Sequence, residues 1–215
     1  MITEPEPKPA PHVAVDSFHA AAKDCHLTFL TGKKGAGEFL DLHKDVFWGM
    51  PASQRSVFLK YLSYPQLLRA LMGGHHLLGL YSPDHVMLAQ ARVTFPELPG
   101  TSNLEAYPFG STLKKEDCAV IQSLGVHPKT NGNGGLYIKE IFDGAKGVAE
   151  GENCRYLLGK ISFGNDNDTI NNHRSHKTFI RNHFTQMTQP AFIGSDTYKS
   201  VFMVRDLTVP VMVAP

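Results

Sequence analysis

The sequence has few cysteines, no long apolar run and almost no net charge, and each scarcity excludes a class of protein. Cys25, Cys118 and Cys154 are odd in number and widely spaced, which argues against a disulfide framework and against a paired-cysteine metal site. No apolar run approaches the roughly 18 residues of a membrane-spanning helix, and the proline-rich start does not resemble a signal peptide. A net charge of +1 gives no overall attraction to nucleic acid. We therefore expect a cytoplasmic protein with no membrane span and no nucleic-acid partner.

What the sequence does contain is the composition of a globular protein. Hydrophobic residues make up 42% of its 215 residues and charged residues 19%, which is typical of soluble domains with a substantial core. Four prolines alternate with polar residues at the start, so we expect a disordered or extended tail over residues 1–12. The remaining residues, 13–215, are expected to form a single domain.

Apolar periodicity predicts an α/β fold in which strands and helices alternate around a central β-α-β unit within a mixed sheet. Proline at position 65 is expected to separate two helices, and residues 96–112 to form a long loop. The predicted strands are 27–31, 77–81, 86–95, 118–126, 155–163, 191–193 and 200–205, and the predicted helices are 36–47, one from 51 to about 62, 67–72, 136–148 and 171–183.

The stretch from Ser123 to Leu136 reads Ser-Leu-Gly-Val-His-Pro-Lys-Thr-Asn-Gly-Asn-Gly-Gly-Leu and leads from an apolar strand into a helix. Free backbone N–H groups at such a helix start, together with the helix dipole, make an anion site suited to a phosphate or pyrophosphate. A glycine-rich turn that binds nothing is the alternative interpretation. The stretch lacks the Gly-Lys-Ser/Thr ending of a P-loop and the spacing of a dinucleotide-binding loop.

Two motifs in this part of the chain resemble the GNAT (Gcn5-related N-acetyltransferase) superfamily. Leu124, Val126 and Pro128 stand where the family's strand motif has Leu-x-Val-x-Pro, and residues 131–136 occupy the loop that holds the pyrophosphate of acyl-CoA. Asn131 departs from the family by replacing an arginine or glutamine, and Leu136 by replacing a small residue. The resemblance covers residues 77–207.

The second motif runs from Asn172 to Phe184 and keeps the family spacing Asn-x-x-Ala-x-x-Leu-Tyr-x-x-x-Gly-Phe. Ser175 stands for the alanine, Phe179 for the tyrosine and His183 for the glycine. The resemblance implies a mixed, mostly antiparallel sheet flanked by helices, with acyl-CoA lying between its splayed fourth and fifth strands.

By this resemblance, the co-substrate is acetyl-CoA or another acyl-CoA. Backbone groups of Leu124 and Val126 would hold the pantetheine and the acyl carbonyl, and Asn172 and Phe179 would approach it from the later helix. The pyrophosphate would lie on the loop formed by Asn131, Gly132, Asn133, Gly134, Gly135 and Leu136.

The catalytic groups of the family are only partly present. Phe179 has no hydroxyl to protonate the leaving thiolate, although a thiol with a pKa of about 8.5 can leave without an acid. Strand alternation is expected to place Val120, Gln122, Leu124 and Val126 on the site-facing side, without a carboxylate. Gln122, by orienting a water molecule, is therefore the first catalytic candidate. Ser123 beside it is the second, although alternation turns it to the other face.

Clustered histidines at positions 173, 176 and 183 suggest a metal site at first sight. No carboxylate or cysteine at a ligand spacing completes the set, and Arg174, Lys177 and Arg181 lie among them. We therefore interpret this helix as a basic face beside phosphate or solvent and predict no metal site.

The sequence thus predicts a GNAT-type N-acyltransferase that transfers an acyl group, with acetyl as the default, from acyl-CoA to a small-molecule or peptide amine. One alternative keeps the fold but uses a longer acyl chain on CoA or on acyl carrier protein, as N-acyl amino acid synthases and homoserine-lactone synthases do. Another is a catalytically silent acyl-CoA-binding module. The acceptor is not specified by any motif, and a homodimer is left open.

Overall fold

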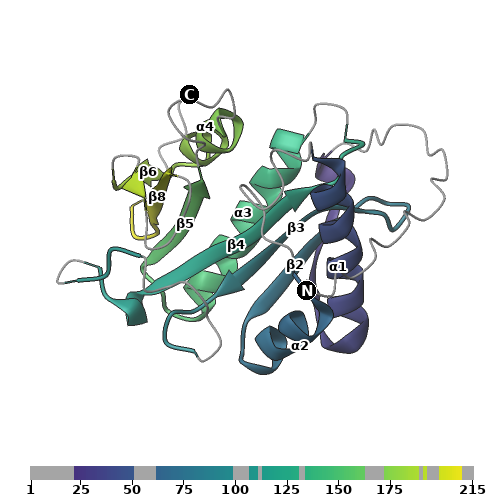
Figure 1. Cartoon of the computed structure of the whole chain (residues 1–215), viewed down its shortest axis with the longest axis horizontal. Coiled ribbons are helices and arrows are strands. Elements are labelled where there is room, and N and C mark those ends of the chain that lie inside the picture. The colour runs from purple at the N-terminus through teal and green to yellow at the C-terminus, as the bar shows by residue number, and fades with distance from the viewer. Residues whose placement is uncertain are drawn as a thin grey trace, which may run out of the picture.

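A single sheet is the centre of the molecule (Figure 1). Its order is β1-β2-β3-β4-β5-β8-β6, with β7 also pairing with β8, and of these pairs only β4 with β5 is parallel. This confirms the predicted mixed, mostly antiparallel sheet with a central β-α-β unit. The computed structural model describes residues 22–50, 62–98, 107–110, 113–130, 134–162, 172–188, 191–192 and 199–209.

Most elements lie where the sequence predicts them, but two differences stand out. The two-residue strand β6 was not predicted, and Pro65 lies in the first turn of a helix that was expected to begin after it. The predicted tail over residues 1–12 and the predicted helix from residue 51 lie outside the described residues. The strands are β1 (His26–Leu30), β2 (His76–Tyr81), β3 (Met87–Thr94), β4 (Cys118–Val126), β5 (Tyr156–Ser162), β6 (Thr185–Gln186), β7 (Ala191–Phe192) and β8 (Lys199–Asp206), and the helices are α1 (Gly32–Gly49), α2 (Tyr64–Met72), α3 (Gly134–Gly151) and α4 (His173–Arg181).

Helix α2 shows why the proline lies inside the later helix and not before it. Pro65 lies in its first turn, where a backbone N–H would have no helical partner and the fixed φ of proline suits the helix. Ser63 caps this end, and its backbone N–H donates to Oε1 of Gln66 at 2.8 Å in a capping box. The proline therefore begins the helix.

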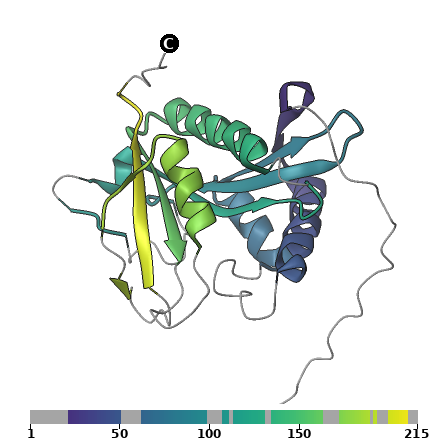
Figure 2. The same ribbon diagram turned by 90° about the horizontal axis from the view of Figure 1, so that it is seen from above.

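The two faces of the sheet are covered by different helices (Figure 2). Helix α3 packs on one face, where its buried side chains Ile141 and Phe142 join Leu78, Val93 and Leu157 of the strands. Helices α1 and α2 cover the first strands on the opposite face. A third apolar cluster lies farther along the sheet and is formed by Tyr107, Leu113, Cys118, Val120, Leu158 and Phe202.

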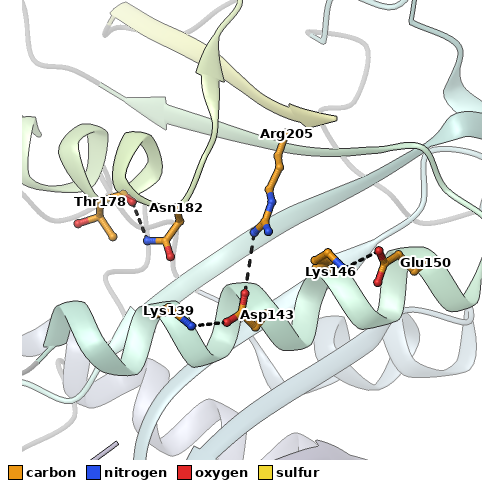
Figure 3. A network of polar contacts seen from close by, with 7 residues as sticks. All are labelled: Lys139, Asp143, Lys146, Glu150, Thr178, Asn182 and Arg205. Carbon is orange, nitrogen blue, oxygen red and sulfur yellow. Dashed lines mark hydrogen bonds and ion pairs between the residues drawn. The ribbon is translucent and has the colours of Figure 1, made fainter. Parts of the chain in front are cut away.

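Polar contacts tie the last strand to α3 (Figure 3). Arg205 of β8 is 6% exposed and extends its Nη1 to within 4.0 Å of Oδ1 of Asp143 on α3. Asp143 also accepts a 2.7 Å hydrogen bond from Nζ of Lys139 one turn earlier. The buried guanidinium thus has a carboxylate of α3 nearby, which compensates part of the cost of burying its charge. None of the helices in the described ranges is long and apolar enough to cross a membrane.

Candidate functional site

A gap opens between β4 and β5 halfway along their length. Their parallel pairing begins at Cys118 with Tyr156 and ends at Ile121 with Gly159. Beyond that point β4 stays paired with β3 and β5 with β8, and the two strand ends diverge in Figure 1. The edge of β4 after Ile121 therefore carries backbone N–H and C=O groups that no described strand pairs, and such groups require a partner.

A β-bulge in β4 lies directly at the start of the gap. Gln122 is paired with Arg92 and Gly125 with Gln90, so Ser123 and Leu124 together oppose the single residue Ala91. Ser123 has a φ of 53°, in the left-handed region that L-residues adopt at a cost of about 1–2 kcal/mol. Bulges of this kind redirect side chains beside functional sites.

The bulge corrects the predicted alternation of β4. Val120 belongs to the apolar cluster around Tyr107, and strand alternation places Gln122 on the same face. Leu124 and Val126 pack against the core on the α3 face instead. The extra residue shifts the period by one, so the four side chains expected on a single face divide into two pairs.

Gln122 has an arginine as its partner on the neighbouring strand. Nη2 of Arg92 donates a hydrogen bond to Oε1 of Gln122. Arg92 is half-buried, and burial lowers the pKa of its guanidinium. The amide oxygen of Gln122 is therefore engaged, which leaves its NH₂ group as the part directed to other partners.

The N-terminus of α3 lies against the end of β4, as the anion-site interpretation requires. Gly134 begins the helix and is buried. A Cβ at this position would lie 3.2 Å from Cγ1 of Val126, 3.6 Å from Oγ1 of Thr130 and 3.7 Å from Nη2 of Arg174. The helix N-terminus thus has a hydroxyl group and a guanidinium beside it, both suited to an anion.

The other predicted residues of the loop divide between described and undescribed parts of the chain. Asn131, Gly132 and Asn133 lie outside the described residues. Gly135 is exposed, and the side chain of Leu136 is 55% exposed, so both lie at the surface of the first helical turn. The structure brings this turn and β4 together, and the roles of these residues in binding stay predictions.

Helix α4 carries Phe179, and Asn172 immediately precedes the helix. Asn172 precedes its first turn, and its carbonyl accepts a 3.1 Å hydrogen bond from the N–H of His176. Phe179 is 5% exposed and packs its ring against Phe142 and Phe184, with centroid distances of 4.9 Å and 4.8 Å. Its ring covers Gly159, where the β4–β5 pairing ends. Phe179 is therefore a core residue at the head of the gap, and its predicted contact with the thioester stays a prediction.

The cysteines do not form a nucleophilic site. Burial raises the pKa of Cys118 to about 12 and that of Cys154 to about 11, so both are neutral thiols near pH 7. Burial also lowers the pKa of His127, which follows β4, although Asp45 opposes the effect. The histidines of α4 join no group of three potential metal ligands within the described ranges, and Nε2 of His176 lies 2.9 Å from Oε1 of Gln186.

Sequence reasoning missed Gln90, Arg92 and the position of Arg174. A signal for the first two is present in β3, where Gln90, Arg92 and Thr94 alternate with apolar residues in a strand that is covered on both faces. Polar side chains in such a strand are unusual and indicate a site. The place of Arg174 over Gly134 depends on how α4 packs, which no local pattern reports.

Comparison with solved structures identifies the fold. An N-acetyltransferase from Staphylococcus aureus Mu50 aligns with 85% of this chain and 97% of its own length, with a TM-score of 0.58 and 17% identity. A Salmonella typhimurium protein assigned as an acetyltransferase was solved with acetyl-CoA. It aligns with 87% of this chain and 96% of its own length, with a TM-score of 0.58 and 12% identity. Mutant forms of the spermidine/spermine N-acetyltransferase of Vibrio cholerae align with 86% of this chain and 95% of their own length, with a TM-score of 0.56 and 9% identity. No family model and no curated protein sequence matches the chain.

These likenesses confirm that the chain has the GNAT acyl-CoA N-acyltransferase fold over most of its length. At 9–17% identity they concern the fold alone. One fold can host different activities, so the likeness does not specify the reaction of this chain.

Proposed function

We propose that this protein is an acyl-CoA-dependent N-acyltransferase, with acetyl-CoA as the default donor. One observation carries the proposal: β4 leaves β5 at a bulge, and the free edge of β4 leads directly to the N-terminus of α3. An extended pantetheine chain fits a free strand edge because it carries amide groups, and a pyrophosphate fits the helix N-terminus.

Each part of the site has a role in this proposal. Backbone groups of Leu124 and Val126 would bind pantetheine, and the first turn at Gly134 would bind the pyrophosphate. A backbone N–H at the bulge would donate to the oxygen that becomes negative when the amine attacks the thioester carbonyl. The C–N bond forms, the C–S bond breaks, and the proton lost by the amine ends on the sulfur of CoA.

The side chains provide little acid–base chemistry at this point. Gln122 and Ser123, the two candidates on the bulge, do not titrate near neutral pH, so their role would be to hold water that carries the proton away. Phe179 cannot protonate sulfur, but a CoA thiolate is a good leaving group without help. We therefore expect real but slow transfer.

The proposal is tested by thermal unfolding with acetyl-CoA and CoA. At about 100 times its dissociation constant, a ligand that binds only the folded state adds about 2.7 kcal/mol to the free energy of unfolding. For a chain of this size that raises Tm by about 5–10 °C. Gly134→Asp should abolish the increase because it places a carboxylate against the pyrophosphate.

Two matched variants separate charge from crowding. Gly134→Ala adds only the Cβ, 3.2 Å from Val126, and Gly135→Ala adds one with no neighbour within 4 Å. Both should keep the increase in Tm. An undiminished increase in Gly134→Asp would remove the helix N-terminus from the site, and no increase in the unmodified protein would contradict acyl-CoA binding. Mass spectrometry of reactions with amine panels and acyl-CoA of different chain lengths then measures transfer and donor preference.

A further inference from the structure

The face of the sheet opposite α3 carries a polar row between two apolar clusters. Arg92 of β3 is paired with Leu77 of β2 on one side and with Gln122 of β4 on the other. Leu77 belongs to the cluster beneath α1 and α2, and the neighbouring pair Thr94–Val120 leads into the cluster around Tyr107. Polar side chains at the centre of a covered face are expected to have a purpose, since apolar ones would be easier to bury.

The polar groups of this row are incompletely paired. Gln90 is 0% exposed, and neither its Nε2 nor its Oε1 has a hydrogen-bond partner in the described structure. Nε of Arg92 is likewise buried without a partner, while Nη2 binds Gln122. A buried amide or guanidinium N–H without a partner costs about 1–3 kcal/mol, and most native proteins avoid it.

Arg92 also differs from two other arginines of the described chain, Arg155 and Arg205, in its charge environment. Arg155 and Arg205 both have carboxylates nearby, at 3.1 Å from Asp206 and 4.0 Å from Asp143. Among the described residues, no carboxylate lies within ion-pair distance of Arg92, and burial is the cause of its lowered pKa. A half-buried guanidinium without a counter-charge is suited to receive an anion, because its planar fork binds a carboxylate through two parallel hydrogen bonds.

Arg92 lies beside the point where β4 separates from β5, which is where the reacting groups are proposed to meet. Gln122 is the last residue of β4 before the bulge and follows the final β4–β5 pair. An anion on Arg92 would therefore lie beside the head of the gap, on the face away from α3 and its phosphate-binding turn. A molecule that carries a carboxylate close to its amine would bind Arg92 with one group and present the other to the thioester.

We propose that the acceptor is an amino carboxylate, such as an α-amino acid, whose carboxylate is bound by Arg92 with support from the NH₂ group of Gln122. This inference rests on the proposed acyltransferase function and specifies its acceptor. It separates this protein from acyltransferases of the same fold that act on polycations, because a guanidinium at this position repels a cationic acceptor.

The test uses the twenty L-amino acids and their carboxamides as matched acceptors, with acetyl-CoA and a long-chain acyl-CoA as donors. The two members of a pair share the side chain and the amino group, and only the acid has the α-carboxylate. We expect kcat/KM for the best acid to exceed that of its amide at least tenfold. Arg92→Met should lower kcat/KM for the acid at least tenfold more than that for the amide, and this extra loss should appear mainly in KM. Arg92→Lys keeps the charge, so its kcat/KM for the acid should lie between those of the unmodified protein and Arg92→Met.

A second readout separates failure of this inference from failure of the proposed function. The increase in Tm with CoA alone reports the donor site and should persist in Arg92→Met, which also shows that the variant folds. With CoA bound, the preferred amino acid should raise Tm further in the unmodified protein and not in Arg92→Met. The inference would be overturned by equal transfer to acids and amides, or by equal losses for both in Arg92→Met. It would also be overturned if CoA binds but neither readout depends on the acid. Absence of CoA binding would instead contradict the acyltransferase function.

Discussion

Arg174 is the single residue that most changes the expectation for the proposed phosphate site. In the resemblance to the GNAT motif, Asn131 stands where an arginine or glutamine is expected, so this position has no long side chain for a pyrophosphate. Arg174 belongs to α4 instead, and its Nη2 lies 3.7 Å from the Cβ position of Gly134. A cation from a neighbouring helix can therefore take the role that the loop lacks.

Replacement of Arg174 by methionine tests this compensation. The variant keeps the aliphatic stem and loses the charge, so CoA should bind about tenfold more weakly, a difference of about 1.4 kcal/mol. Binding should also depend less on salt. Isothermal titration calorimetry at two ionic strengths measures both effects.

Lys177→Met provides the control for that measurement. Lys177 is exposed on the same helix and carries the same charge, so its loss changes the net charge equally. We expect less than a twofold change in affinity. Equal effects in the two variants would show that α4 acts only through its overall charge.

At the scale of elements, the β4 bulge decides how the site is arranged. The strand itself, Cys118–Val126, was predicted with the same bounds from its apolar run. The bulge was not predictable, because Ser123 and Leu124 are ordinary strand residues and the left-handed φ at Ser123 is imposed by pairing with β3. Local pattern therefore identified the element, while the faces of its last residues depended on tertiary pairing.

Gly159 of β5 is a second point where the element depends on a contact across layers. A Cβ there would lie 2.3 Å from Cε1 and 2.8 Å from Cζ of Phe179, which is a rigid ring held by Phe142 and Phe184. Gly159→Ala should therefore lower the free energy of unfolding by about 1–3 kcal/mol through overpacking. Urea denaturation measures this change in the free energy of unfolding.

Gly147→Ala is the matched control, since Gly147 is exposed within α3 and its Cβ would have no neighbour within 4 Å. Alanine should stabilise the helix there by about 0.5–1 kcal/mol. Replacing Phe179 by leucine in the Gly159→Ala background should recover part of the loss. If Gly159→Ala is as stable as the unmodified protein, α4 does not pack on β5 as described.

At the scale of the whole molecule, the fold assigns different chemistry to the two faces of one sheet. The α3 face carries the largest apolar cluster and the proposed phosphate site at Gly134, while the opposite face carries the polar row of Arg92 and Gln122 between two smaller clusters. The gap between β4 and β5 connects them. Donor and acceptor would therefore approach from opposite sides and meet at the bulge, which is where a transfer between them needs to occur.

Sequence reasoning proposed residues for the donor side of this arrangement and none for the acceptor side. The residues around Gly134 and Asn172 follow one another in short motifs, so their spacing in the chain reflects their spacing in space. Arg92 and Gln122 are 30 positions apart and meet only because β3 and β4 pair in one register. A strand register depends on the whole sheet, so a local pattern cannot specify it.

The central claim is that acyl-CoA binds along the free edge of β4 and ends on the N-terminus of α3. Amide hydrogen exchange measured by mass spectrometry with saturating CoA tests it most directly, because the claim concerns specific backbone N–H groups. We predict slower exchange in peptides covering residues 123–126 and 134–137, and unchanged exchange in those covering β1 and the first half of α1. Protection elsewhere, with none in these two segments, would contradict the account.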